Sequence, residues 1–171
     1  MLSIRTNTFL LRPWQPEDIP SLTAEANNPR ISSNLRDSFP YPYTTKDAED
    51  FIHYAGSKPT AQEFAIVIDG KAVGGIGISP LADVERFSAE VGYWIGESWW
   101  NKGIATEALR TFAGYLFAHT NFVRLFACVY ACNLPSVRVL EKAGFRRVGV
   151  LQKAAFKNNR FVDMFYYERV V

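Results

Sequence analysis

Two apolar stretches that meet at Asp69-Gly70 constrain the fold of this chain more than any other feature. The run EFAIVIDGKAVGGIGIS places β-favouring residues on both sides of this pair. Asp-Gly between two such runs is the strongest short signal for a two-residue β-hairpin turn. The pattern therefore predicts an antiparallel hairpin, and with it a sheet on which the other elements pack.

Three glycines in the second half of this hairpin, Gly74, Gly75 and Gly77, invite comparison with a dinucleotide-binding loop. They fall inside a predicted strand, and Pro80 occupies the position of the last glycine in a GxGxxG motif. Glycine inside a strand more often marks a bulge or a close approach of another backbone. We therefore expect close packing here and no phosphate loop.

The other expected elements give a mixed order of strands and helices. A strand at Phe9 runs into a helix with Pro16 in its first turn, and Thr44 begins a second helix with Asp47 three residues later, as in a capping box. Later strands are expected at 87–96, 122–131, 146–156 and 160–171, with helices starting near Gly103 and Asn133. The predicted fold class is α+β, one domain over residues 1–171. We expect about seven strands in a mixed, mostly antiparallel sheet with one strand–helix–strand crossover, and about four helices on both faces.

Composition excludes several classes of protein. The 171 residues carry a net charge of +2 without a basic cluster, which argues against duplex nucleic acid as a partner. No run of eighteen apolar residues predicts a membrane span, and the start of the sequence lacks a signal-peptide pattern, so a cytoplasmic location is expected. Cys128 and Cys132 are interpreted as small buried thiols of a reducing compartment, and the distant His53 and His119 predict no metal site.

The segment WWNKGIATEALR raises a chemical question, because glycine is a poor residue for the first turn of a helix. A helix start presents unpaired N–H groups and partial positive charge, which suits phosphate. Glycine at Gly103 would leave these groups open, with Lys102 adding a cation and Asn101 capping the helix. The Walker spacing is absent. The alternative is that Gly103 only permits close packing of helix on sheet.

A second polar pair, Asn133 and Ser136, stands at the start of the next predicted helix. Helices that follow neighbouring parallel strands begin at the same end of a sheet, so this pair could face a ligand held at Gly103. Asn and Ser also commonly cap helices, which is the alternative explanation.

At this point the sequence resembles a known family. The run EVGYWIGESWWNKGIATEAL, followed by NLPSVRVLEKAGF, is similar to the GNAT superfamily of acetyl-CoA-dependent N-acetyltransferases, and more narrowly to its RimJ/RimL-like branch. FLLRPW, FPYPYT and NNRFVDMFYYERV extend the resemblance over essentially the whole chain. The resemblance implies a GNAT-like fold, acetyl-CoA as cosubstrate, no metal, and an amine acceptor.

The resemblance also assigns residues to the cosubstrate. It implies that backbone amides in the first turn hold the pyrophosphate, that one strand pairs with the pantetheine arm, that Asn133 hydrogen-bonds the arm, and that Ser136 lies near the thioester sulfur. The amides are those of Lys102, Gly103, Ile104, Ala105 and Thr106, and the strand residues are Tyr93, Trp94 and Ile95. The chain departs from the superfamily at Trp100, where Gln or Arg is usual.

The catalytic base is the least defined part of this prediction. RimL-like enzymes can carry a carboxylate before the last hairpin turn, but here the chain reads Lys153-Ala154-Ala155-Phe156. Glu90 is the first substitute, acting through a water, and Asp163 the second. An α-amine with a pKa of about 8 needs less help from a base than a lysine at about 10.4, which favours a protein N-terminus as acceptor.

Three hypotheses follow. The first is acetylation of a protein N-terminal α-amine, of the ribosomal-protein type, with Ser136 donating a proton to the leaving thiolate and Phe39, Tyr41 and Tyr43 walling the acceptor. The second is the same chemistry on a small amine, such as a polyamine, an amino acid or an aminoglycoside. The third is a non-catalytic acyl-CoA-binding domain. A homodimer is compatible with each.

Overall fold

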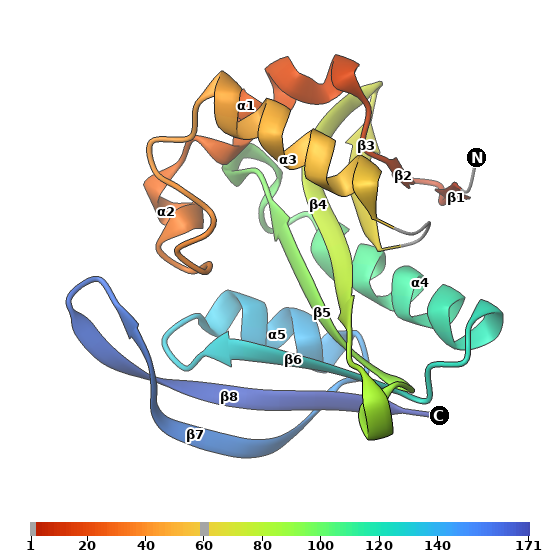
Figure 1. Cartoon of the computed structure of the whole chain (residues 1–171), viewed down its shortest axis with the longest axis vertical. Coiled ribbons are helices and arrows are strands. Elements are labelled where there is room, and N and C mark those ends of the chain that lie inside the picture. The colour runs from red at the N-terminus through yellow and green to blue at the C-terminus, as the bar shows by residue number, and fades with distance from the viewer. Residues whose placement is uncertain (1–2, 59–61) are drawn as a thin grey trace. The chain divides into compact units, whose positions relative to one another are not determined.

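The computed structural model describes residues 3–58 and 62–171, and its strands follow the order β1-β2-β3-β4-β5-β6-β8-β7 (Figure 1). The chain divides into two compact units. The first comprises Met1–Gly77 and Tyr93–Ala105, and the second comprises Ile78–Gly92 and Thr106–Val171. Strands β4 and β5 contribute to both units, and each unit is described in turn.

The sheet of the first unit confirms the predicted hairpin. Strands β1 (Ile4–Arg5), β2 (Leu10–Pro13), β3 (Glu63–Ile68) and β4 (Lys71–Pro80) pair antiparallel in this order. The β3–β4 turn has positive φ at Asp69 (49°) and Gly70 (79°), as the Asp-Gly pair requires. Ile66 pairs with Gly74 and Val67 with Ala72, so β4 carries a bulge between them. A Cβ built on Gly74 would lie 3.0 Å from Ile95 Cα, which confirms close backbone packing.

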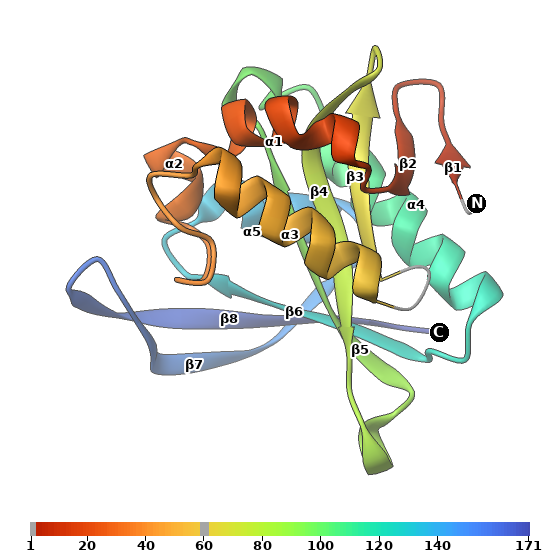
Figure 2. The ribbon, with the colours of Figure 1, turned by 45° about the horizontal axis from the view of Figure 1, so that its top comes forward.

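Helices α1 (Ile19–Ala26) and α3 (Thr45–Ser57) pack together over one face of this sheet (Figure 2). The α3 cap is the predicted box, in which Thr44 Oγ1 accepts from Asp47 N–H at 3.3 Å and Asp47 Oδ2 accepts from Thr44 N–H at 2.7 Å. Below the helices lies a core built from both layers. It contains Trp14, Leu22, Ala26, Tyr43, Ala48, Ile52, Ala65, Val67 and Ala72.

Three short elements complete this unit. A 3₁₀ turn, η1 (Pro16–Asp18), leads into α1, and a second, η3 (Glu97–Trp99), follows β5. Helix α2 (Pro29–Ser32), which the sequence analysis did not predict, begins at Asn28, whose side chain accepts from Arg30 N–H at 2.8 Å. Asp18 is buried and pairs with Arg12 at 2.7 Å, which joins β2 to η1.

The second unit contains the predicted crossover and the last hairpin. It holds the Ser88–Gly92 part of β5 (Ser88–Ile95), most of α4 (Ile104–His119), β6 (Arg124–Tyr130), α5 (Leu134–Lys142), β7 (Arg146–Lys157), β8 (Arg160–Val170) and a 3₁₀ turn, η2 (Asp83–Glu85). Strand β5 pairs with β6 in parallel, while β8 pairs antiparallel with β6 and β7. Gly144 follows α5 with φ 88°, the left-handed conformation expected where a helix ends.

The predicted fold class is confirmed, with small additions. The described residues form eight strands and five α-helices, compared with the expected seven and four, because β1 and α2 are short elements with weak sequence signals. The apolar stripe of α4 is also confirmed: Ile104, Ala108, Leu109, Phe112 and Leu116 are buried. The interpretation of the cysteines was wrong in part. Cys132 is exposed because it lies in the turn before α5, and Cys128 is half-buried.

Candidate functional site

The turn before α4 differs from the sequence prediction in one respect that matters. Helix α4 begins at Ile104, so Gly103 precedes the helix and does not lie within its first turn. Gly103 has φ 77° and is exposed. A Cβ built on it would meet no heavy atom within 4 Å, so close packing does not explain this glycine. Its left-handed backbone does, and a side chain at this position would stand in open space directly before the first α4 amides.

Asn101 does not have the predicted capping position. It lies three residues before Ile104 and has φ 60° itself, so the residue that flanks α4 is Gly103, which has no side chain to offer. Lys102 is exposed, and its ammonium lies 4.7 Å from the centre of the Trp99 ring. The helix start therefore presents backbone donors and one nearby cation, which suits an anion.

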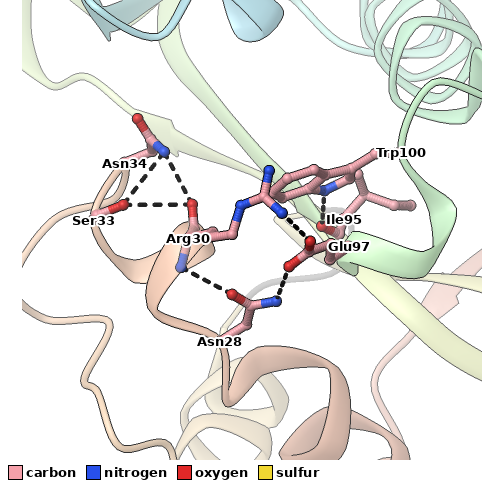
Figure 3. Close-up of polar contacts among 7 residues, drawn as sticks. All are labelled: Asn28, Arg30, Ser33, Asn34, Ile95, Glu97 and Trp100. Carbon is pink, nitrogen blue, oxygen red and sulfur yellow. Dashed lines mark hydrogen bonds and ion pairs between the residues drawn. The ribbon is translucent and has the colours of Figure 1, made fainter.

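The loop that carries this turn is fastened to α2 by charged and polar side chains (Figure 3). Glu97 accepts from Asn28 Nδ2 at 2.6 Å and forms an ion pair with Arg30. The Arg30 guanidinium also lies 5.0 Å from the centre of the Trp100 ring. These contacts fix the path of the loop between β5 and α4.

The two tryptophans anchor the same loop from its other side. Trp100 Nε1 donates to the Ile95 carbonyl at 2.8 Å, and Trp99 Nε1 donates to Glu25 of α1 at 3.2 Å. Glu25 packs over Gly96, where a built Cβ would lie 2.7 Å from its carboxyl carbon. Trp100 occupies the loop position where the superfamily usually has Gln or Arg. In this structure a guanidinium, that of Arg30 on α2, lies against the Trp100 ring.

The β5 segment predicted to bind the pantetheine arm has its backbone groups directed to two sides. The Trp94 carbonyl lies against Gly74 of β4, while the Ile95 carbonyl accepts from Trp100. Gly96 N–H donates to the Val73 carbonyl of β4 at 2.8 Å. Alternate residues of a strand direct their backbone groups to opposite sides, so Tyr93 and Ile95 face away from β4. They are the members of this segment that an added extended ligand would meet.

The predicted acceptor wall is partly formed within the first unit. The Phe39 ring lies 5.1 Å from Tyr43 and 5.5 Å from Trp94, measured between ring centres. Tyr43 is buried, and burial, followed by the charge of Asp47, raises the pKa of its phenol. Tyr41 is 53% exposed, and its place in the acceptor wall stays a prediction.

The acidic residues at the start of α3 are engaged in local structure. Asp47 closes the capping box, where its hydrogen bonds with Thr44 lower its pKa, and Asp50 forms an exposed ion pair with Lys46. These contacts support the interpretation of the cluster as a solvated helix start, and they weaken the case for a polyamine site.

In the second unit, Asn133 and Ser136 meet through a helix cap. Asn133 is the N-cap of α5, and its Oδ1 accepts from Ser136 N–H at 3.3 Å. Both side chains are half-buried. Capping uses the oxygen of Asn133, and the amide nitrogen carries two further donors that a ligand could use. Thr106, in the first turn of α4, is also half-buried.

The two carboxylates predicted as bases have different surroundings in the second unit. Glu90 lies on β5 opposite Phe126 of β6 and is half-buried. Asp163 is exposed and accepts from Lys153 N–H at 2.7 Å, where β7 bulges between Leu151 and Ala155. Asp163 therefore joins the two strands of the last hairpin. Ala155 pairs with Val162 in that hairpin.

Two negative findings apply to the described residues. Within ranges 3–58 and 62–171, no group of three or more His, Cys, Asp or Glu side chains is arranged to hold a metal ion. Of the helices in this part of the chain, none has both the length and the apolar character needed to cross a bilayer.

Sequence reasoning missed two features of the site region. The Asn28–Arg30–Glu97 network joins residues far apart in the chain, and only the local Asn28-Pro29 pair, a cap followed by a first-turn proline, gave a signal for α2. The second feature is Glu63, the polar first residue of an apolar strand, which pairs with Gly77.

Comparison with known proteins identifies the relatives of this chain. It is 35% identical to the probable N-acetyltransferase YjcK of Bacillus subtilis, over 94% of this chain and 92% of that protein. It is 28% identical to the L-amino acid N-acetyltransferase AaaT of Escherichia coli, over 66% and 70% of the two chains. The ribosomal-protein-serine acetyltransferase of Escherichia coli is 26% identical, over 80% and 79%.

A solved structure shares the fold. RimL, a ribosomal L7/L12 α-N-protein acetyltransferase solved in complex with coenzyme A, superposes with a TM-score of 0.86 at 20% identity, covering 99% of this chain and 98% of that one. The family model for the acetyltransferase (GNAT) domain matches residues 8–146. With the mixed sheet, the crossover and the glycine turn before α4 already described, this match shows that the chain is a member of the GNAT acetyltransferase family.

Proposed function

We propose that this protein transfers an acetyl group from acetyl-CoA to a primary amine, and that its acceptor is the α-amine of a protein N-terminus. The observation that carries the cosubstrate is the Gly103 turn, which is left-handed and exposed, directly precedes the first amides of α4, and has open space where a side chain at Gly103 would stand. This arrangement fits a pyrophosphate, whose oxygens need donors and whose bulk needs space. We propose that residues 1–171 act as one acetyltransferase domain.

The proposal assigns the cosubstrate to the residues that the family resemblance indicates. The amides of Lys102, Gly103, Ile104, Ala105 and Thr106 hold the pyrophosphate, and Lys102 adds a cation. Tyr93, Trp94 and Ile95 line the pantetheine arm, with Tyr93 and Ile95 on the side away from β4, where the Ile95 carbonyl already accepts from Trp100 Nε1. The amide nitrogen of Asn133 donates to the arm.

The reaction is a direct attack of the neutral amine on the thioester carbonyl, and it needs no covalent enzyme intermediate. Binding both substrates in one orientation supplies much of the rate enhancement. The departing thiolate gains a proton, for which we propose the Ser136 hydroxyl. The amine must lose its extra proton before attack, and Glu90, through a water, is the sequence-based candidate for this step.

The acceptor assignment rests on three observations. The ring cluster of Phe39, Tyr43 and Trp94 gives an aromatic wall, and two of the carboxylates at the start of α3, Asp47 and Asp50, are engaged locally, which speaks against a polyamine. The names of two relatives give a serine of a ribosomal protein and an L-amino acid as acceptors. A weak base favours an α-amine over a lysine. We also propose that the protein acts in the cytoplasm, either as a monomer or as a homodimer.

Thiol release from acetyl-CoA, measured across a panel of peptides, amino acids, polyamines and aminoglycosides, tests the proposal. We expect turnover with peptides that carry a free N-terminus and none with the same peptides after N-terminal blocking. Turnover only with small amines would replace the acceptor and keep the chemistry. Tight binding of CoA in calorimetry without turnover on any amine would instead show a non-catalytic acyl-CoA-binding domain.

A further inference from the structure

Glu63 occupies an unusual position for a carboxylate. It is the first residue of β3 and pairs with Gly77 of β4. A Cβ built on Gly77 would lie 2.7 Å from the Glu63 carboxyl carbon and 2.6 Å from the Gln62 carbonyl oxygen. The carboxylate therefore lies in the space that any side chain at Gly77 would take, flat against the β4 backbone. Gly77, the third glycine of this strand, leaves the space that the Glu63 carboxylate occupies.

The face of the sheet that carries Glu63 is the face of the aromatic wall. Ala65 and Val67, which follow Glu63 at intervals of two, belong to the core beneath α1 and α3. A Cβ on Gly75, two residues before Gly77, would lie 2.9 Å from Trp94 Nε1. Alternate residues of a strand share a face, about 7 Å apart. The Glu63 carboxylate thus lies roughly that distance along β4 from the Trp94 indole.

This face also contains a buried polar group without a partner. The Trp14 indole lies against Gly75, 3.1 Å from its built Cβ, and its Nε1 has no hydrogen-bond partner among the described residues. Buried donors are rarely left unpaired, so the Trp14 Nε1–H calls for a partner such as a water or a bound group. The glycine-lined stretch of β4 therefore brings together a carboxylate, an unpaired donor and an aromatic wall.

The carboxylate itself has a perturbed proton affinity. Burial raises the pKa of Glu63 from 4.5 to about 7, and the charge of Lys58, just after α3, opposes this rise. Within the described ranges, Lys58 is the charged group that acts on Glu63, and no described residue forms a hydrogen bond or ion pair with its carboxylate. Gly77, the backbone of Gln62 and the β4 strand supply no countercharge.

We propose that the Glu63 carboxylate is the base that takes the proton from the acceptor amine. The inference rests on the proposed acetyl transfer and names a residue that the sequence analysis did not consider. A base is most effective when its proton affinity is near the working pH and near that of the group it deprotonates, and an α-amine has a pKa of about 8. Of the other two candidates, Asp163 accepts from the Lys153 amide, and Glu90 lies on β5 opposite Phe126 of β6.

The proton balance of the step is simple. The ammonium gives one proton to Glu63, and the neutral amine attacks the carbonyl carbon. The C–N bond forms and the C–S bond breaks. The Ser136 hydroxyl gives its proton to the departing thiolate and takes the second amine proton in its place. The products are the acetylated amine and the CoA thiol, and Glu63 releases its proton to solvent before the next turnover.

The test compares pH–rate profiles of the parent, Glu63→Gln and Glu90→Gln with a peptide acceptor. For Glu63→Gln we expect turnover about 100-fold lower and loss of the acidic limb near pH 7, leaving only the limb of the amine itself. The affinity for CoA, measured by calorimetry, should stay within threefold of the parent. Glu85→Gln, on exposed η2, is the matched control and should change neither quantity.

Two further measurements separate a base from a structural group. Carboxyl NMR of the protein without ligand should show Glu63 titrating near pH 7, and Lys58→Gln should move both this titration and the acidic limb upward together. Glu63→Asp should restore part of the turnover lost in Glu63→Gln. If Glu63 had only a structural role, the titration of its carboxyl and the acidic limb of the rate profile would not shift together, and Glu63→Asp would not restore turnover.

The outcomes that would overturn the inference are distinct. If Glu63→Gln turns over within threefold of the parent, or if Glu90→Gln removes the acidic limb while Glu63→Gln keeps it, Glu63 is not the base. If the parent acetylates no amine, the proposed function falls, and the role of Glu63 falls with it.

Discussion

The starts of α4 and α5 look alike in sequence but are built differently in the structure. Each follows a strand, and each was predicted to contact the cosubstrate. Helix α5 begins at Asn133, which caps its own helix through the Ser136 amide at 3.3 Å. Helix α4 begins after Gly103, which is left-handed, exposed and without a side chain to use. The residue before α5 supplies a side-chain cap, whereas the residue before α4 has no side chain with which to supply one.

The starts of α4 and α5 differ in what they contribute to the stability of the fold. An Asn cap contributes about 1 kcal/mol relative to Ala, whereas glycine in a folded chain costs more backbone entropy than any other residue. The α4 start is therefore the less stable of the two solutions. The loop that leads to the α4 start is anchored by Glu97, Trp99 and Trp100, so the turn at Gly103 is held in a defined position.

The largest effect is expected at Gly103. In Gly103→Val, a β-branched side chain at φ 77° would both strain the backbone and cover the first α4 amides. We expect the CoA affinity to fall at least about 100-fold, a loss of about 2.7 kcal/mol, and the free energy of unfolding to fall by about 1–3 kcal/mol. Calorimetry with CoA and urea unfolding measure the two quantities.

Gly70 provides a matched control for this substitution. It has φ 79° in the β3–β4 turn, and a Cβ built there would also meet no atom within 4 Å. Gly70→Val should therefore show the same kind of strain with unchanged CoA affinity. Equal CoA binding by folded Gly103→Val and Gly70→Val would show that the α4 start does not hold the pyrophosphate, and the contrast between the two helices would lose its functional meaning.

The next effect concerns the Glu63 carboxylate, which we expect to lower the free energy of unfolding at neutral and basic pH. The Glu63 pKa is raised by burial, so the folded protein binds this proton more tightly than the unfolded chain. Stability from this proton is present below pH 4.5 and is lost as the pH rises through about 7. Glu63→Gln should match the parent at pH 4 and exceed it at pH 8.5, by at most about 3 kcal/mol.

Urea unfolding of both proteins at the two pH values checks this sign, with Glu85→Gln as the control for an exposed carboxylate. A variant that is less stable than the parent at pH 8.5 would show that the charged Glu63 is stabilised by the fold. That result would place Glu63 with Asn133, among residues that complete their own structure, and would remove the stability argument for a functional role.

At Asn133, two substitutions separate the cap from the ligand contact. Asn133→Asp keeps an acceptor oxygen for the Ser136 amide, while Asn133→Ala removes it and should cost about 1 kcal/mol of stability. If the amide nitrogen of Asn133 binds the pantetheine arm, Asn133→Asp should keep the unfolding midpoint and lose about 5- to 10-fold in CoA affinity, the value of one hydrogen bond. An unchanged affinity in Asn133→Asp would reduce Asn133 to a cap.

The parts of the molecule that sequence predicted are those with local signals. Asp69-Gly70, the Thr44–Asp47 box and the α4 stripe each depend on residues a few positions apart, and the structure confirms them. The site was predicted only where a motif carries it. Glu97 meets Arg30 across 67 positions of sequence, and Glu63 meets Gly77 only because the hairpin register aligns them. Such pairings depend on tertiary structure, which a single sequence does not encode locally.

The placement of Gly103 shows the same limit on a smaller scale. Its residue type correctly drew attention to the turn, but whether glycine serves packing, a left-handed backbone or ligand access depends on φ and on neighbouring atoms. These are known only from the structure, where φ is 77° and a built Cβ meets no atom within 4 Å.

The smallest effect is expected from the anchor of the α4 loop. In Arg30→Ala, the loop loses the pair with Glu97 and the stacked contact with Trp100. The two charged side chains are 66% and 37% exposed, so solvent screens their attraction, and the loss of stability should be about 1 kcal/mol or less. Lys46→Ala, which breaks the exposed pair with Asp50 on α3, is the matched control for a surface ion pair.

Because the Arg30 guanidinium lies against Trp100, where the superfamily has Gln or Arg, we expect Arg30→Ala to lower the affinity for CoA about threefold and Lys46→Ala to leave it unchanged. We also measure CoA binding by Arg30→Lys and by the parent at raised salt. If CoA affinity falls in proportion to the loss of the contact between Arg30 and the Trp100 ring, the α4 start depends on a side chain from α2 as well as on its own backbone. Equal CoA affinities in Arg30→Ala and Lys46→Ala would mean that the α4 start binds CoA through backbone donors without help from Arg30. The contrast with α5, which uses the side chain of Asn133, would then be sharper.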